Sequence, residues 1–293
     1  MRTEQEMLEL ILNKARNDDR IRGVLLSGSR VTETATHDKY SDFDIIYIVD
    51  GIQSITKDKE WYKIFGEILI MQLPEDWYAY PYDYEGNENY AYLMQFTDGN
   101  RIDLTLVDKK NLCKLDKEEP RKVLLDKDNS PELYDITTEE AYHIKRPGEL
   151  EYFNCCNEFW WLTLYVAKGL CRDEFYYVKT ILDQYMMPML VKQLNWRIGI
   201  NHDFQISTGH YSKYLRRFIS EEEMRRFRRV HGGELSDEIW TSLERMMEYF
   251  EELALSVGEN FNYNYDIEET ARIRQYIQKM KEECETDSKE KKR

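Results

Sequence analysis

Two aspartates, Asp42 and Asp44, are separated only by Phe43 at the start of an apolar run that ends at Val49. Because alternate side chains of a strand point to the same side, both carboxylates should share one face. Carboxylates that close repel each other unless a cation lies between them or water screens them. Their hard oxygen atoms suit Mg²⁺, which proteins commonly share with substrate phosphates. The pair therefore predicts a magnesium site.

A glycine turn precedes this pair in the chain. Gly28 and Ser29 follow the apolar run at residues 24–26, a pattern that predicts a buried strand entering a tight turn. Glycine allows the backbone to come close to a phosphate, and the turn can direct N–H groups and the Ser29 hydroxyl toward it. Arg30 could add a positive charge. We expect a phosphate-binding turn next to the metal.

A third acid, Asp103, lies inside the strand-like run at 101–107. The Asp98-Gly99 turn joins this run to another at 90–96, which is a strong hairpin signal. Asp103 has apolar neighbours, and we interpret it as an acid that interrupts their pattern. On a strand antiparallel to that of Asp44, it could reach the metal as a ligand or accept a proton as a base.

The remaining pattern predicts an α+β protein with two domains. Residues 1–132 should form a mixed sheet with helices, residues 133–285 a helical domain, and residues 286–293 a charged, disordered tail. Pro188 should kink or end one long helix. A cleft between the two domains is expected to hold the substrates. The expected helices cover 3–17, 54–65, 149–169, 173–195, 236–256 and 267–284, and the expected strands cover 24–26, 43–49, 67–73, 90–96 and 101–107.

Composition narrows the possible partners. The net charge of −15, from 41 basic and 56 acidic residues, disfavours a nucleic-acid partner. The chain has no run of about 20 apolar residues that would indicate a membrane span. Its five cysteines include no CxxC pair, so neither a zinc site nor a disulfide framework is expected. Reduced thiols and a cytoplasmic location follow from this. The oligomeric state stays open.

The motifs resemble those of a known enzyme family. GSRVTETATHDKYSDFD carries the signature of the nucleotidyltransferase superfamily, in which Gly-Ser precedes Asp-x-Asp. The segments LLSGSR, SDFDIIYIV, RIDLTLV and CCNEFWWLTLYVAKGLCRDE resemble the aminoglycoside 6-adenylyltransferases. The similarity covers nearly the whole chain except the charged tail.

The resemblance implies a reaction and a set of roles. It implies transfer of AMP from ATP to the 6-hydroxyl of streptomycin, with Mg²⁺ as cofactor and antibiotic resistance as the result. Asp42 and Asp44 then match the metal-binding pair, and Asp103 matches the third acid. Gly28 and Ser29 match the phosphate-binding turn. Helical lysines that could contact the triphosphate are Lys168 and Lys179.

The acceptor would be a cationic sugar, which calls for carboxylates and aromatic faces. The candidates are residues 77–85, Glu88, Asp98, Glu158, Trp160 and Asp183. The turn at 207–210 could bind phosphate or simply cap a helix. Two alternatives stay open. One is a nucleotidyltransferase for another small molecule, a protein or RNA, and the other is a non-catalytic nucleotide-binding or antitoxin-like module.

Overall fold

The computed structural model describes the backbone of residues 1–79 and 89–291, and the side chains of residues 1–76 and 89–286. Its contacts divide the chain into two compact units, Met1–Ala141 and Tyr142–Arg293. The sequence placed this division earlier, after residue 132. The segment beyond that point stays with the first unit because Arg121 and Ile136 exchange two backbone hydrogen bonds of 2.9 Å.

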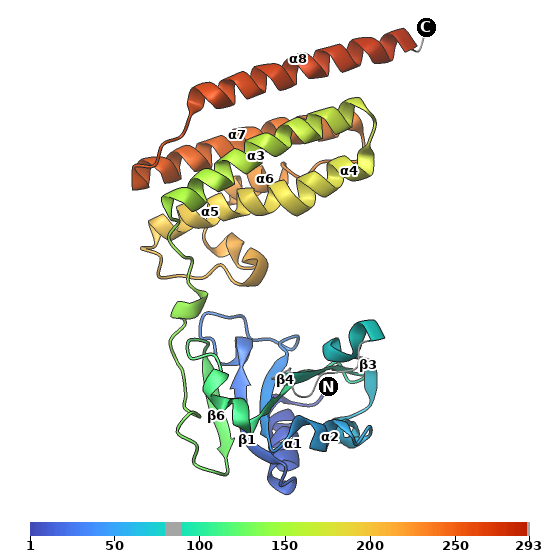
Figure 1. Cartoon of the computed structure of the whole chain (residues 1–293), viewed down its shortest axis with the longest axis vertical. Coiled ribbons are helices and arrows are strands. Elements are labelled where there is room, and N and C mark those ends of the chain that lie inside the picture. The colour runs from blue at the N-terminus through green and yellow to red at the C-terminus, as the bar shows by residue number, and fades with distance from the viewer. Residues whose placement is uncertain (80–88, 292–293) are drawn as a thin grey trace. The chain divides into compact units, whose positions relative to one another are not determined.

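The first unit is built on a six-stranded sheet with the order β3-β4-β5-β2-β1-β6. The predicted α+β fold is confirmed. Helix α1 precedes the sheet, and α2 with several 3₁₀ turns connects its strands (Figure 1). The elements are α1 (Glu4–Asn17), β1 (Ile21–Ser27), η1 (Gly28–Arg30), β2 (Phe43–Val49), α2 (Ile52–Thr56), η2 (Trp61–Phe65), β3 (Ile68–Gln72), η3 (Pro74–Ala79), β4 (Asn89–Phe96), β5 (Arg101–Asp108), η4 (Lys109–Lys114) and β6 (Arg121–Asp126).

The strand that carries Asp103 runs parallel to the strand that carries Asp44, so the expected antiparallel arrangement is wrong. Strands β3, β4 and β5 pair in an antiparallel manner, and two reversals return β5 to the direction of β3. The connection from β2 to β3 passes through α2 and η2, and after it β3 runs in the same direction as β2. Strand β5 is therefore parallel to β2. Neighbours β1 and β2, and likewise β1 and β6, are antiparallel.

One face of the sheet is packed under α1 and α2 (Figure 1). From α1, Met7 and Ile11 join a core to which β2 and β5 contribute alternate side chains, and the Tyr47 hydroxyl donates a 2.6 Å hydrogen bond to the Ile11 carbonyl. Ile102 and Leu104 point into this core and are about 1% exposed. Asp103 therefore does not interrupt the apolar pattern. It belongs to the opposite face, as strand alternation requires.

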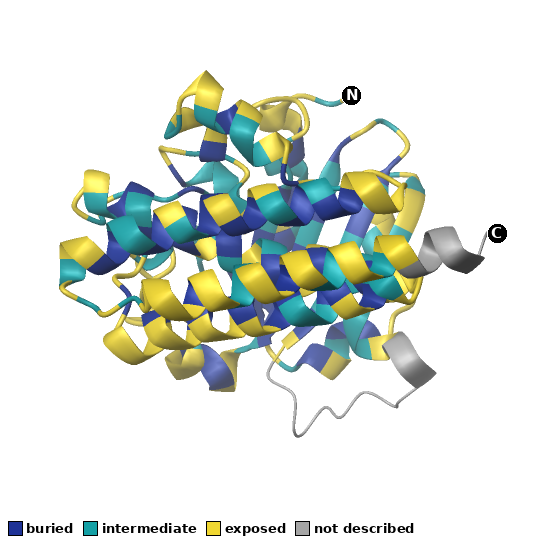
Figure 2. Cartoon of the chain, turned by 90° about the horizontal axis from the view of Figure 1, so that it is seen from above, coloured by how far each residue is buried: buried dark blue, intermediate teal, exposed yellow. Residues whose placement is uncertain are grey.

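The second unit is helical and has a continuous apolar core, in which Phe159 and Phe250 stack with ring centroids 3.6 Å apart. Figure 2 shows buried and exposed positions alternating along its long helices. In the described residues, no helix is long and apolar enough to cross a membrane. The elements are α3 (Glu149–Cys171), α4 (Phe175–Thr180), the π-helical η6 (Ile181–Met186), α5 (Met187–Asn201), α6 (Glu221–Arg228), α7 (Ser236–Phe261) and α8 (Ile267–Lys291), with 3₁₀ turns η5 (Glu140–Tyr142) before them and η7 (His210–Ser212) and η8 (Leu215–Arg217) between α5 and α6.

Three features of this unit differ from expectation. Pro188 does not end its helix, because it lies in the first turn of α5 directly after the π-helical turn. The irregular hydrogen bonding of the π-helical turn lies directly before this proline. Helix α8 continues to Lys291, well into the segment expected to be a disordered tail. Cys171 and Cys284, expected as thiols, form a disulfide because α3 and α8 bring their Cα atoms within 5.4 Å.

Candidate active site

The two central acids are neighbours across the parallel strands. Asp44 and Asp103 are Cα partners in the register of β2 and β5. On the other side of β2, Asp44 pairs with Ser27, the last residue of β1. The chain then turns through η1, so Gly28 lies beside the Asp44 carboxylate. Three segments far apart in the sequence thus meet where the neighbouring strands β5, β2 and β1 begin or end.

Gly28 is required at this turn for two reasons. Its φ is +66°, a left-handed conformation that glycine adopts without steric penalty. A Cβ atom at this position would lie 2.0 Å from Oδ2 of Asp44, which is far closer than any van der Waals contact. The backbone of the turn is therefore pressed against the carboxylate. Phosphate binding by this turn stays a prediction.

Burial and the neighbouring negative charges both disfavour the ionised form of Asp44. Burial, followed by the nearby charges of Asp103 and Asp42, raises the pKa of Asp44 to about 6. The charges of Arg101 and Arg30 act in the opposite direction. A carboxyl group with such a pKa is partly protonated near neutral pH, so its ionised form lacks sufficient positive charge around it. A divalent cation at this place would supply that charge.

Arg101 was not among the predicted site residues, yet it contacts two of the acids. Its Nε and one terminal nitrogen donate hydrogen bonds of 2.7 Å to the two carboxylate oxygens of Asp103. Its Nε lies 3.6 Å from Oδ2 of Asp42. The sequence contains the signal that would have found it, because residues two apart on a strand share a face. Arg101 therefore compensates part of the charge of the acidic cluster.

Arg30 is held by the protein rather than directed outward. Its guanidinium donates to the carbonyl oxygens of Asp42 and Ser41 at 2.9 and 2.7 Å, and forms a 2.9 Å ion pair with Glu4. The guanidinium carbon also lies 3.7 Å from the centre of the Phe43 ring. These contacts fix the backbone that presents Asp42. A phosphate contact by Arg30 stays a prediction, as does the one by Ser29 in turn η1.

The donor chemistry of the cluster suits Mg²⁺, but the cluster is not preformed around an ion. The carboxylates of Asp42, Asp44 and Asp103 are hard oxygen donors of the kind that magnesium prefers. Among the described residues, however, no group of three or more His, Cys, Asp or Glu side chains is arranged to hold a metal. Both carboxylate oxygens of Asp103 accept hydrogen bonds from Arg101. A metal ion bound by Asp103 would share these oxygens with Arg101 or displace it from them.

The other predicted residues are dispersed. Lys168 is exposed near the end of α3, and Lys179 on α4 forms a 3.1 Å ion pair with Asp183. Both belong to the second unit, and their contact with a triphosphate stays a prediction. The turn at 207–210 is stabilised internally, because the Ser207 hydroxyl accepts a 3.0 Å hydrogen bond from the N–H of Gly209.

The acceptor-binding candidates also have different surroundings. Asp98 stabilises the β4–β5 turn, where hydrogen bonds from Arg2 hold its pKa below the usual range. Glu158 is exposed on α3, whereas Trp160 is buried and lines a cavity. Of the aromatic segment at 77–85, the structure describes only the backbone of residues 77–79. The rest of the segment and Glu88 lie outside the described residues.

Comparison with known proteins agrees with the motifs. A sequence model of the streptomycin adenylyltransferase family matches residues 1–280. The chain is 36% identical to an aminoglycoside 6-adenylyltransferase of Campylobacter jejuni, over 99% of this chain and 100% of that protein. It is 34% identical to the protein of that name from Bacillus subtilis (strain 168), over 90% and 93% of the two chains. A crystal structure of an aminoglycoside 6-adenyltransferase from Bacillus subtilis aligns with a TM-score of 0.48 and 32% identity, covering 96% and 99% of the two chains. The chain therefore belongs to the streptomycin adenylyltransferase family and is a nucleotidyltransferase.

Proposed function

We propose that this protein transfers AMP from ATP to the 6-hydroxyl of streptomycin and thereby confers resistance. The observation that carries the proposal is the pairing of Asp44 with Asp103 across β2 and β5, directly beside the Gly28 turn. An acidic pair next to a phosphate-binding turn is the arrangement that phosphoryl chemistry on a metal–nucleotide complex requires. The names of the relatives supply the acceptor class.

The reaction forms one bond to phosphorus and breaks another. The acceptor oxygen bonds to the α-phosphorus of ATP, while the bond from that phosphorus to the bridging oxygen breaks and pyrophosphate leaves. Mg²⁺, when held by Asp42, Asp44 and Asp103 with the phosphates, would neutralise the negative charge that develops on the leaving group. The proton of the acceptor hydroxyl must be transferred to a base, and Asp103 is our assignment.

The surrounding residues would position these groups. The N–H groups and hydroxyl of Gly28 and Ser29 would bind the phosphate chain, and Arg30 would fix the backbone of Asp42 through its hydrogen bonds. Because Arg101 holds both oxygens of Asp103, it would orient that carboxylate until the substrates arrive. With ATP as the donor, we place the reaction in the cytoplasm.

The test is pyrophosphate release from ATP and Mg²⁺ with single aminoglycosides, combined with mass spectrometry and NMR of the product. We expect release with streptomycin and a product that carries AMP on the 6-hydroxyl. Asp103→Asn should abolish release, whereas Asp50→Asn, an exposed acid just beyond β2, should not. Release with kanamycin but not streptomycin would reject the acceptor, and no release with any aminoglycoside would reject the reaction.

A further inference from the structure

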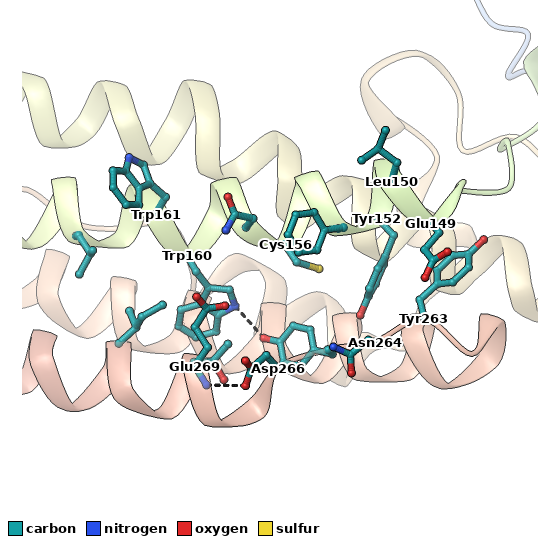
Figure 3. A pocket seen from close by; sticks show the side chains of 16 residues that line it. Glu149, Leu150, Tyr152, Cys156, Trp160, Trp161, Tyr263, Asn264, Asp266 and Glu269 are labelled. Atoms are coloured by element: carbon teal, nitrogen blue, oxygen red, sulfur yellow. Dashed lines mark hydrogen bonds between the residues drawn. The ribbon is translucent and has the colours of Figure 1, made fainter.

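A recess lies wholly within the second unit, whereas the acidic cluster belongs to the first. It is a cavity of about 390 Å³ between α3 and the first turns of α8, closed at one end by residues 263–266. Its volume falls within the range of small-molecule sites. Figure 3 shows Tyr152, Cys156 and Trp160 pointing from α3 toward α8, with Asp266 and Glu269 on the opposite side. We call this recess the α3–α8 groove.

Aromatic side chains form much of the groove. Trp160 is fixed in place because its indole N–H donates a 2.8 Å hydrogen bond to the Tyr265 hydroxyl (Figure 3). Phe153 and Trp161 lie about two turns apart on α3. Both line the groove, and they are 57% and 54% exposed. Exposed apolar surface that is contiguous with a cavity is typical of ligand-binding grooves.

The charged side chains of the groove are all negative. Glu149, Asp266 and Glu269 line it, and no lysine or arginine occurs among its described lining residues. In the part of the chain that the structure describes, none of these three acids forms an ion pair. Other acids of the second unit do, and three such pairs are Glu151 with Lys192 at 2.6 Å, Glu244 with Lys281 at 2.8 Å and Glu251 with Arg274 at 3.0 Å.

Arg274, which contacts the groove residue Trp160, is already paired with another acid. The guanidinium of Arg274 lies 5.1 Å from the Trp160 ring, but Glu251 already accepts its hydrogen bond at 3.0 Å. Asp266 accepts a 2.8 Å hydrogen bond from the N–H of Glu269 and so caps α8. Each of the three carboxylates therefore keeps oxygen atoms that can accept hydrogen bonds from a ligand.

We infer that the α3–α8 groove binds a ring-bearing organic cation, with amine or guanidinium groups on a saturated ring. The carboxylates would accept the charged N–H groups, and the aromatic faces would cover the ring and attract its positive charge. The choice of an aminoglycoside as the occupant rests on the proposed function. The shape and charge of the groove do not depend on it.

The experiment is isothermal titration of the full-length protein with streptomycin in the absence of ATP and Mg²⁺. Glu269→Gln removes one carboxylate at an exposed position and should weaken binding about fivefold. Trp161→Ala should weaken it by a similar factor. Glu268→Gln is the matched control, because Glu268 is 93% exposed, lies beside Glu269 in the chain and does not line the groove. Circular dichroism checks that each variant is folded.

The outcomes separate this inference from the proposed reaction. Binding that weakens in both groove variants but not in Glu268→Gln supports the inference, even if no pyrophosphate is released with any acceptor. If the wild type releases pyrophosphate and both groove variants keep their affinity for streptomycin, the groove inference is wrong and the proposed reaction stands. Failure of the wild type to bind streptomycin or kanamycin also overturns it. Spermidine that binds as tightly as streptomycin would refute the requirement for a ring.

Discussion

Replacing Gly28 by alanine tests the close approach of the glycine turn to Asp44. The added Cβ atom would lie 2.0 Å from Oδ2 of Asp44, whereas ordinary contacts begin at 3.4 Å. The carboxylate or the turn must therefore move by about 1.4 Å. A misplacement of about 1 Å at a reacting centre can lower turnover about 100-fold. We expect Gly28→Ala to lose about two orders of magnitude in kcat.

The same substitution also strains the backbone, and this effect needs its own control. An alanine at positive φ destabilises a protein by about 1–2 kcal/mol. Gly51 has a φ of +80°, and nothing lies within 4 Å of its Cβ position. Gly51→Ala should therefore lower the free energy of unfolding, measured in urea, without lowering kcat. Pyrophosphate release compares the two variants. Near-normal turnover of folded Gly28→Ala would refute the reasoning.

Further predictions concern the acids and their arginines. Burial raises the pKa of Asp44 from 3.8 to about 6, so the folded state holds this proton more tightly than the unfolded chain and is weakened as the pH rises through this range. In the metal-free protein, Asp44→Asn should thus gain stability relative to wild type between pH 4 and 7, by up to about 3 kcal/mol in urea titrations. An equal difference at both pH values would contradict this. Arg101→Gln should lower metal-free stability by about 1 kcal/mol, since it removes two bonds to Asp103, and added Mg²⁺ should reduce the deficit in thermal melts. A deficit that Mg²⁺ leaves unchanged would count against competition for Asp103. Arg30→Met should lower kcat about tenfold in steady-state assays, because it removes the hydrogen bond that fixes the backbone of Asp42. An unchanged kcat would show that this contact is dispensable.

Local patterns in the sequence were sufficient to predict the strands that carry the acids. The alternating apolar residues from Phe43 to Val49 gave the bounds of β2, and the Asp98-Gly99 turn gave the β4–β5 hairpin. These signals are reliable because each depends on residues close together in the chain. The predicted helix at 54–65 is instead the short α2 followed by the 3₁₀ turn η2, and residues of both elements pack in the core of the first unit.

Features that depend on distant segments could not be predicted. The parallel pairing of Asp44 with Asp103 follows from the crossover through β3, which no local pattern specifies. The disulfide between Cys171 and Cys284 depends on the packing of α3 against α8, 113 residues apart in sequence. The contact of Arg101 with Asp103 could have been predicted, because the two residues are two positions apart on one strand. Its contact with Asp42 could not, because Asp42 lies directly before a different strand, β2.

The most direct test of the account is the binding of Mn²⁺, measured by the EPR signal of the free ion, in the presence of a non-hydrolysable ATP analogue. We predict that the wild type binds the ion and that Asp42→Asn, Asp44→Asn and Asp103→Asn each bind it at least about tenfold more weakly. Asp50→Asn should bind as the wild type does. If Asp44→Asn and Asp103→Asn also keep wild-type affinity for Mn²⁺, these carboxylates do not hold the catalytic metal, and the account is wrong.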